Sequence, residues 1–336
     1  MTTLKTSYMG LELKNPLIVG ASSLTGKVEN LKAIEEAGAG AIVFKSLFEE
    51  QIQLEELELE NELEQYNERH AEMIRLFPLL KHAGPAEHLS KLKKAKELLS
   101  IPIIASLNAM HPDTWEEYAV AIAETGVDAL ELNFYTTPKN FEVEGKTIIQ
   151  SQQETLERVK KTVKIPVSVK LSPFYTNPLD VIRRFDSTEI DGIVLFNRLF
   201  QPDINIDKEE LVQSITLSEQ TDMQLPLRFV GLVFGNIAAD LCANTGILSG
   251  SDAIKMILAG ASAFQIVSAL YKNGIGFIPK ILSEMEAWMQ EKGYKTIDEF
   301  KGKLAKKNVH DPFAYQRAQY VDILLRSNDI IVHKMP

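Results

Sequence analysis

The chain has 336 residues, 45% of them hydrophobic and 24% charged, which is the composition of a globular protein that buries a large core. Its net charge of -10 argues against nucleic acid or an anionic membrane as a partner, because both repel an acidic surface. A single cysteine, Cys242, excludes a disulfide, a zinc cluster or an iron–sulfur cluster built within the chain, and it favours a reducing, cytoplasmic compartment. The N-terminus shows no signal-peptide core, and no apolar run approaches the roughly 20 residues of a membrane span.

Short apolar runs alternate with helical patterns along most of the chain, after an N-terminal stretch through Gly10 that is predicted to form a hairpin at a barrel base. Strands are predicted at 16–23, 41–46, 101–108, 127–134, 165–173, 191–197, 239–246 and 263–267. Helices are predicted at 28–37, 88–99, 114–124 with Asp113 as N-cap, 152–163, 179–185, 227–237, 250–259 and 274–292. The strand runs lack alternation with period two, as expected for parallel strands buried on both faces. The pattern predicts an α/β fold, a (β/α)8 TIM barrel, as one domain over residues 1–336.

Three stretches depart from this rhythm. Residues 47–85 form a long insertion after the second strand, rich in Glu with Leu at mixed spacing. This insertion is either a solvated amphipathic excursion or a lid or homodimer element, since long insertions after barrel strands lie on the catalytic face. Residues 198–225 are predicted to be a long loop, and residues 303–336 a C-terminal extension of the barrel.

Polar residues recur where the predicted strands end. They are Ser22, Ser23, Lys45, Ser46, Asn108, Asn133, Lys170, Asn197, Thr245, Gly246 and Ser268. The carboxyl ends of barrel strands face the active site, so these residues predict a site for a small ligand. Amides suit a planar heterocycle because they offer donors and an acceptor, and lysines stabilise negative charge that develops on such a ring.

Other chemistries have little support at these strand ends. No histidine falls there, which argues against a histidine triad or a metal site, and no carboxylate pair is placed for glycoside hydrolysis. Glu131 lies two residues before Asn133, where it faces the barrel interior and needs a partner.

The stretch 244–270 contains two strand-to-helix turns of small residues, one βα unit apart. The first leads through Ser249 and Gly250 into a helix that Gly260 ends, and the second leads into a helix at Ser268. In a barrel, the loops after strands seven and eight commonly bind phosphate through backbone N–H groups. The alternative is an ordinary βα repeat with small residues in tight turns.

These segments together resemble the dihydroorotate dehydrogenases, FMN-dependent barrel oxidoreductases, over most of the chain. The similar segments are GLELKNPLIVGASS, AGAGAIVFKS, DALELNF, PVSVKL, TGILSGSDAIKMILAGASAFQIVSAL and EKGYKTIDEFKGKL. The resemblance implies FMN contacts at Ala21, Ser22, Lys45, Ser46, Asn108, Asn133, Lys170, Thr245, Gly246, Val267 and Ser268. It implies substrate contacts at Lys45, Asn133 and Asn197, and catalytic roles for Thr136 and Lys170.

Several positions depart from the family pattern. Thr245 occupies the position of the family's first phosphate-binding glycine, and Val267–Ser268 occupies the position of a Gly-Thr pair. In the family, an Asn-Ser-Met-Gly segment holds the substrate ring. Its counterpart here is KHAGPAEHL (81–89), which has no asparagine. Asn197 is followed by Arg198 where the family has a second Asn.

Thr136 aligns without a gap to the Cys or Ser that acts as the family's base, but a proline follows one residue late, at Pro138. Tyr135 or Thr137 are therefore alternatives for this role.

The resemblance implies oxidation of dihydroorotate to orotate, a CH–CH donor reaction of pyrimidine biosynthesis. The alternatives are a flavin oxidoreductase for another dihydropyrimidine or an enone, and a flavin-binding protein without turnover. A non-flavin phosphosugar-binding barrel is a further alternative, against which the Asn and Lys strand ends argue. The sequence does not identify the electron acceptor. An iron–sulfur partner has to be a separate chain, and the lack of an N-terminal anchoring helix disfavours a quinone.

Overall fold

The computed structural model describes residues 2–49, 83–108, 112–135, 141–198, 202–213, 216–316 and 318–325. Eight parallel strands form a closed barrel in the order β4-β3-β13-β12-β9-β8-β7-β6, and pairing of β4 with β6 completes the ring. Their bounds are β3 Leu17–Val19, β4 Ala41–Val43, β6 Ile103–Asn108, β7 Ala129–Asn133, β8 Val167–Leu171, β9 Gly192–Leu195, β12 Asp240–Ala243 and β13 Ala263–Ile266. A short strand, β5 (Leu47–Phe48), also pairs with β6. The predicted (β/α)8 TIM barrel is confirmed.

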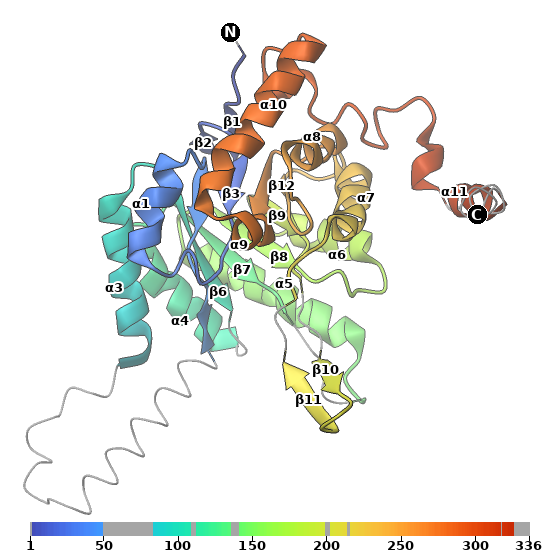
Figure 1. Ribbon diagram of the computed structural model, residues 1–336. Helices are drawn as coiled ribbons and strands as arrows, with labels where there is room; N and C mark the ends of the chain where they lie inside the picture. Colours follow the sequence, from blue (N-terminus) through green and yellow to red (C-terminus); the bar gives the residue numbers. More distant parts are fainter. Residues whose placement is uncertain are drawn as a thin grey trace, which may run out of the picture.

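Helices surround this barrel (Figure 1). They are α1 Val28–Glu36, α3 Ala83–Leu98, α4 Pro112–Ala123, α5 Gly145–Thr162, α6 Pro178–Asp186, α7 Gln224–Val233, α8 Gly250–Ala259, α9 Ser268–Asn273 and α10 Ile278–Lys292. The helix α8 begins and ends as its sequence predicts. Ser249 is its N-cap and accepts a hydrogen bond from the Asp252 N–H, and Gly260 ends it with a φ of 124° that favours glycine.

An N-terminal hairpin closes the amino end of the barrel, as predicted. Its strands are β1 (Thr6–Tyr8) and β2 (Leu11–Leu13), and the buried side chains of Tyr8 and Met9 pack with Ile18, Val43 and Cys242 in the barrel interior. The Met9 N–H donates to Asp240 at 2.9 Å, which fastens the hairpin to the barrel wall. The open, ligand-accessible end is therefore the opposite, carboxyl end of the strands.

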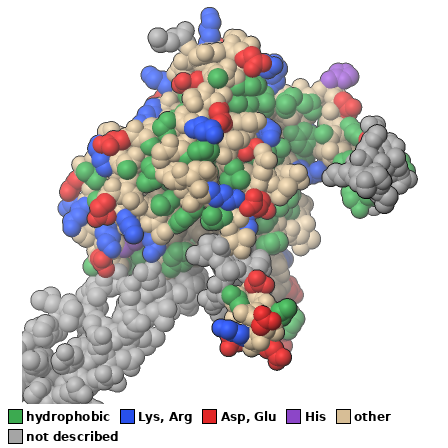
Figure 2. Space-filling view, in the orientation of Figure 1, with side chains coloured by type: hydrophobic (Ala, Val, Ile, Leu, Met, Phe, Trp, Pro, Cys, Tyr) green, Lys and Arg blue, Asp and Glu red, His purple; other side chains and the backbone are tan. Residues whose placement is uncertain are grey.

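The segment 198–225 is not the plain loop that the sequence predicts. It contains a two-stranded hairpin, β10 (Pro202–Asn205) and β11 (Glu210–Gln213), and a 3-10 helix, η3 (Gln220–Met223). The side-chain oxygen of Asn205 accepts hydrogen bonds from the N–H groups of Asp207 and Lys208 and so shapes the turn. The hairpin projects from the barrel and carries both charged and exposed apolar side chains (Figures 1 and 2).

Some boundaries also differ from the predictions. α4 begins at Pro112, so Asp113 lies in its first turn rather than at the N-cap, and its carboxylate pairs with Arg158 at 2.7 Å. α5 begins at Gly145, earlier than predicted, and Ile149 in its first turns packs against the core on the same side as Leu156 and Val159. The predicted helix 274–292 divides into a 3-10 turn, η4 (Ile275–Phe277), and α10.

The C-terminal extension begins on the barrel surface and then leaves it. The N–H groups of Leu304 and Lys306 donate to the carbonyls of Leu258 and Gly231, which joins the extension to α8 and α7. The last described helix, α11 (Ala318–Leu325), lies apart from the barrel (Figure 1). Most of the insertion 47–85 lies outside the described residues, and the one-domain organisation stays a prediction. Within the described ranges, no helix is both long and apolar enough to cross a membrane.

Glu35 joins α1 to the chain that enters β6. Its carboxylate accepts hydrogen bonds from the Ser100 N–H and hydroxyl, both at 2.7 Å, from the Ile101 N–H at 3.2 Å, and from Lys32 at 2.5 Å. Burial acts to raise the pKa of Glu35, but these bonds outweigh it and lower the pKa to about 2.

We expect Glu35→Ala to lower the free energy of unfolding by about 1–3 kcal/mol at neutral pH, because the buried Ile101 N–H and two donors of Ser100 lose their acceptor. The folded-state pKa lies below the ordinary value of 4.5, so the contribution is full above that value and is lost as the pH falls towards about 2. Urea titrations between pH 7 and pH 2 measure this. Glu36→Ala removes an exposed charge from the same helix and is the control, with an expected change within about 0.5 kcal/mol. Equal losses in the two variants at pH 7 would contradict the assignment.

Candidate active site

A cavity of about 430 Å³ lies at the carboxyl end of the barrel, which is within the usual size range of small-molecule sites. It brings together eight of the residues for which the family resemblance implies contacts with FMN or substrate. They are Ala21, Ser22, Lys170, Asn197, Thr245, Gly246, Val267 and Ser268. These residues end or follow five different strands. Closure of the barrel therefore brings them together around one cavity.

Four other predicted residues do not line this cavity. Asn133 lies next to it, because the Asn197 amide donates to the Asn133 side-chain oxygen at 2.9 Å. Asn108 is buried at the end of β6, and the Ser46 hydroxyl is hydrogen-bonded to Ser106 at 2.7 Å. The aliphatic stem of Lys45 runs against Gly26, where an added Cβ would meet Lys45 Cδ at 2.8 Å.

A buried polar chain runs from the cavity into the barrel. Lys170 Nζ lies 2.5 Å from Glu131, and the other oxygen of that carboxylate accepts a hydrogen bond from the Gln265 amide at 2.5 Å. Side chains alternate along a strand, so Glu131 on β7, Lys170 on β8 and Gln265 on β13 all face inward. Glu131 is 1% exposed and needs this partner, as the sequence predicts. Lys170 therefore lines the cavity, and its positive charge is paired with the buried Glu131 carboxylate inside the barrel.

Thr245 and Gly246 form the turn after β12. Both have left-handed backbone angles, with φ of 79° and 75°. Thr245 is held in this unusual conformation by its hydroxyl, which donates to the Phe196 carbonyl at 2.9 Å. This hydrogen bond holds Thr245 in a backbone conformation that glycine adopts easily. It accounts for a threonine being tolerated at this position.

The two helix starts that follow β12 and β13 differ in their surroundings. At the start of α8, the Gly250 N–H already donates to Glu284 at 2.7 Å, and Gly250 does not line the cavity. At the start of α9, Ser268 lines the cavity, and its hydroxyl accepts from the Ser218 N–H at 2.9 Å. Of the two predicted starts, the one at Ser268 is therefore next to the cavity.

Residues 216–223 fold over this end of the cavity, which the sequence did not predict. Thr216, Leu217 and Ser218 line the cavity, and Lys272 donates to the Ser218 carbonyl at 2.9 Å. Arg198, which also lines the cavity, is paired with Asp222 in η3. No local pattern signals this cover, because it depends on contacts between distant loops.

Sequence reasoning also missed Gln265 and Tyr271. Gln265 is the polar residue in the apolar run AFQIV, two positions after Ala263, and this inward register could have indicated it. Tyr271 in α9 is hydrogen-bonded to Ser23 in the loop after β3, so the pair links two sides of the cavity.

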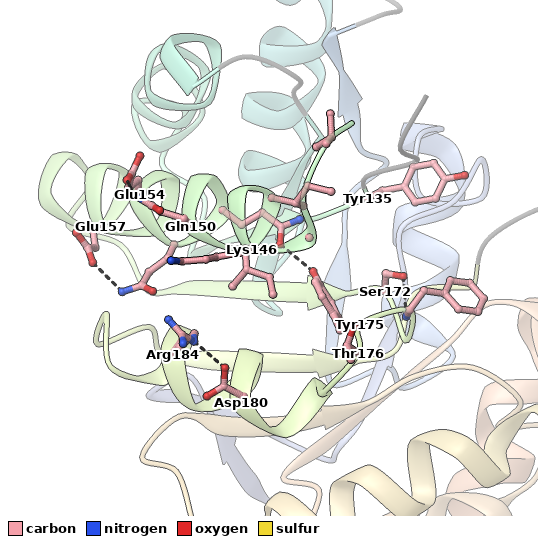
Figure 3. A pocket seen from close by; sticks show the side chains of 17 residues that line it. Tyr135, Lys146, Gln150, Glu154, Glu157, Ser172, Tyr175, Thr176, Asp180 and Arg184 are labelled. Atoms are coloured by element: carbon pink, nitrogen blue, oxygen red, sulfur yellow. Dashed lines mark hydrogen bonds and ion pairs between the residues drawn. The ribbon is translucent and has the colours of Figure 1, made fainter. Parts of the chain in front are cut away.

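A second, larger hollow of about 1220 Å³ lies between α5 and α6 (Figure 3). Its charged side chains have both signs, and they include Lys146, Glu154, Asp180 and Arg184. None of the residues predicted to contact FMN or substrate lines it, so it is not the candidate active site. Tyr135, one of the alternatives for the base, lines this hollow. Thr136 and Thr137 lie outside the described residues.

The cavity has features that fit a flavin. The Ser22 hydroxyl and the Gln265 amide oxygen are buried without a hydrogen-bond partner among the described residues, and both residues line the cavity. Buried polar atoms are rarely left unpaired, so a polar ligand is expected to satisfy them. The charged groups in the described lining are cations, which suits a ligand with phosphate and an electron-accepting ring. Fold and site together define an α/β-barrel protein with a ligand cavity at the carboxyl end of its strands.

The chain belongs to the dihydroorotate dehydrogenase family. The family model described as "Dihydroorotate dehydrogenase" matches residues 3–289, and this family of oxidoreductases is flavin-dependent. A relative from Thermoplasma volcanium, named dihydroorotate dehydrogenase B (NAD(+)), catalytic subunit, is 29% identical over 307 residues, covering 90% of this chain and 98% of its own length. A relative of the same name from Methanocaldococcus jannaschii is 30% identical over 313 residues, covering 89% and 97%. A relative from Aeropyrum pernix, named putative dihydroorotate dehydrogenase A (fumarate), is 27% identical over 315 residues, covering 89% and 96%.

Proposed function

We propose that the protein is an FMN-dependent dehydrogenase that oxidises dihydroorotate to orotate. The observation that carries this proposal is the gathering of eight residues predicted from the family resemblance around one cavity, at the end of the barrel where such enzymes act. The family match over residues 3–289 and the names of the relatives support the same reaction.

For the cofactor, the turn at Thr245–Gly246 and the chain at Val267–Ser268 would hold the phosphate, and Ala21 and Ser22 would contact the ring system. When bound, FMN would supply the hydride acceptor. Lys170 would stabilise the negative charge that accumulates on the ring, and Glu131 would hold the ammonium group in place. Lys45, Ser46 and Asn108 remain proposed contacts on the side of β4 and β6.

For the substrate, Asn133 and Asn197 would orient the ring through amide hydrogen bonds, and the bond between them fixes one amide against the other. Lys45, just after β4, would contribute a cation. A second candidate is a related flavin oxidoreductase acting on another dihydropyrimidine or an enone. It is favoured by the segment 81–89, which lacks the asparagine that holds the substrate ring in family members.

Thr136 is proposed as the group that receives the substrate proton, with a water or neighbouring group as relay, because a threonine hydroxyl is a weak base by itself. We expect Thr136→Ala and Thr136→Val to slow flavin reduction by a factor on the order of 100 to 10,000, the usual size of general-base effects, while FMN stays bound. Stopped-flow absorbance with excess substrate measures the rate. Near-normal reduction in both variants would remove Thr136 from the mechanism, and the same experiment with Thr137→Val then tests the neighbouring candidate.

The function itself is tested by product formation. The FMN-loaded protein is incubated with dihydroorotate and an artificial dye acceptor, and orotate is quantified. Orotate formation supports the proposal. No orotate, together with dye reduction by another dihydropyrimidine or an enone, supports the second candidate instead.

A further inference from the structure

Arg198 differs from the other charged group of the cavity in being open to a ligand. Among the described lining residues, Lys170 and Arg198 carry the charges. The Lys170 side chain is 7% exposed and paired with the buried Glu131, whereas the Arg198 side chain is 28% exposed. An anionic group in the cavity would therefore find its accessible cation at Arg198.

The position of Arg198 is fixed by Asp222. The Asp222 carboxylate also accepts a hydrogen bond from the Glu219 N–H at 2.9 Å, so it is held by the turn that begins η3. This turn lies against Gly246, since a Cβ on Gly246 would collide with the Met223 backbone and meet the Glu219 carbonyl at 3.0 Å. Arg198 is thus brought to the part of the cavity that contains the turn after β12.

The guanidinium group has donors to spare. It carries five N–H donors, and within the described part of the chain it makes one hydrogen bond, to Asp222. The Asp222 carboxylate also accepts a hydrogen bond from the Glu219 N–H, so Arg198 is not its only partner. A ligand oxyanion can therefore share Arg198 with Asp222 or replace it, and a planar guanidinium suits carboxylate and phosphate equally well.

We propose that Arg198 is the anion-binding residue of this cavity, which takes the phosphate of the cofactor or the carboxylate of the substrate in competition with Asp222. This assignment rests on the proposed function for the identity of these ligands, and it adds a side-chain cation to a site predicted to bind phosphate through backbone N–H groups. Asp222 acts as a positioning residue that holds Arg198 and also weakens its attraction for the ligand.

Two variants of the ion pair separate this role from a structural one, because they are expected to act in opposite directions. Arg198→Ala should weaken binding of the anionic ligand by about 10- to 100-fold, the usual size of a charge-assisted hydrogen bond. Asp222→Asn should tighten it severalfold, because the competing charge is removed while an amide oxygen can still accept from the Glu219 N–H. If the pair only fastens the cover of residues 216–223, both variants weaken binding. Arg228→Ala, on α7 outside the cavity lining, is the matched control.

The apoprotein is titrated with FMN and with riboflavin, and both apoprotein and FMN-loaded protein are titrated with orotate and with uracil, by fluorescence and calorimetry. If the anion is the phosphate, Arg198→Ala weakens FMN and leaves riboflavin unchanged. If it is the carboxylate, FMN and riboflavin are unaffected, and orotate is weakened while uracil is not. Unchanged affinity for both FMN and orotate overturns the proposal, as does a loss in Asp222→Asn that matches Arg198→Ala. A wild-type protein that binds neither flavin refutes the proposed function, and the orotate titrations of the apoprotein then decide the role of Arg198 alone.

Discussion

Gly246→Ala is expected to lower the affinity for FMN by about 100-fold or more, which makes it the most damaging single change to the proposed cofactor site. A Cβ at this position would collide with the Met223 backbone and come within 3.0 Å of the Asp222 and Glu219 backbones. The turn after β12 and the cover formed by residues 216–223 lie directly against each other here, so at least one of them would have to move, and the turn is part of the proposed phosphate site. Fluorescence titration of the apoprotein measures the loss.

Gly126→Ala is the matched control for backbone strain. Gly126 has a φ of 83°, close to the 75° of Gly246, but nothing lies within 4 Å of an added Cβ. The left-handed backbone is expected to cost both variants about 1–2 kcal/mol of stability. Gly246→Ala is expected to lose more than this, because its Cβ also collides with the Met223 backbone, and thermal unfolding of the apoproteins measures both losses. FMN binding should fall in Gly246→Ala and stay normal in Gly126→Ala. Full FMN occupancy in Gly246→Ala would refute this placement of the phosphate.

Lys170→Met is expected to lower the reduction potential of the bound flavin by about 30 to 60 mV, or roughly 1.4 to 2.8 kcal/mol for a two-electron couple. This lies below the ~4 kcal/mol of two unit charges ~4 Å apart at an effective dielectric constant near 20, because the charge on a reduced ring is delocalised. Flavin reduction by substrate should slow as well. Equilibrium titration against a reference dye gives the potential.

The loss of Lys170 also leaves Glu131 without its ion-pair partner, and a second substitution at Glu131 serves as the control. Without Lys170, the buried Glu131 carboxylate keeps the Gln265 amide but loses its cation, which typically costs about 3–5 kcal/mol of stability. The double variant Lys170→Met with Glu131→Gln removes both charges and should recover much of that stability, yet its potential should remain below that of the wild type. A wild-type potential in both the single and the double variant would show that Lys170 does not stabilise the reduced ring.

The barrel could be predicted because its strands are buried on both faces. The predicted strand at 263–267 is short and apolar except for Gln265, and the structure has a buried strand at Ala263–Ile266 within these bounds. The hairpin β10–β11 could not be predicted in this way, since its residues are mostly exposed, including the apolar cross-strand pair Ile204 and Leu211. Its shape depends on local hydrogen bonds around Asn205 rather than on burial.

The candidate site was predictable to the extent that it depends on strand ends. Lys170, Asn197 and Gly246 end or follow strands, so closure of the barrel alone brings them together. Residues 216–218 and Arg198 join them through contacts between loops, which no spacing in the sequence encodes. Lys45 and Asn108 occupy strand ends as well, but they belong to the β4–β6 side, where the chain continues into residues outside the described ranges.

The most direct test of the account is reduction of the FMN-loaded protein by dihydroorotate in the absence of oxygen and of any other acceptor. We predict that the yellow colour bleaches and that one orotate forms for each FMN reduced, while apoprotein without FMN forms none. An FMN-loaded protein that keeps its full visible absorbance under saturating dihydroorotate would contradict the proposal that dihydroorotate is the substrate.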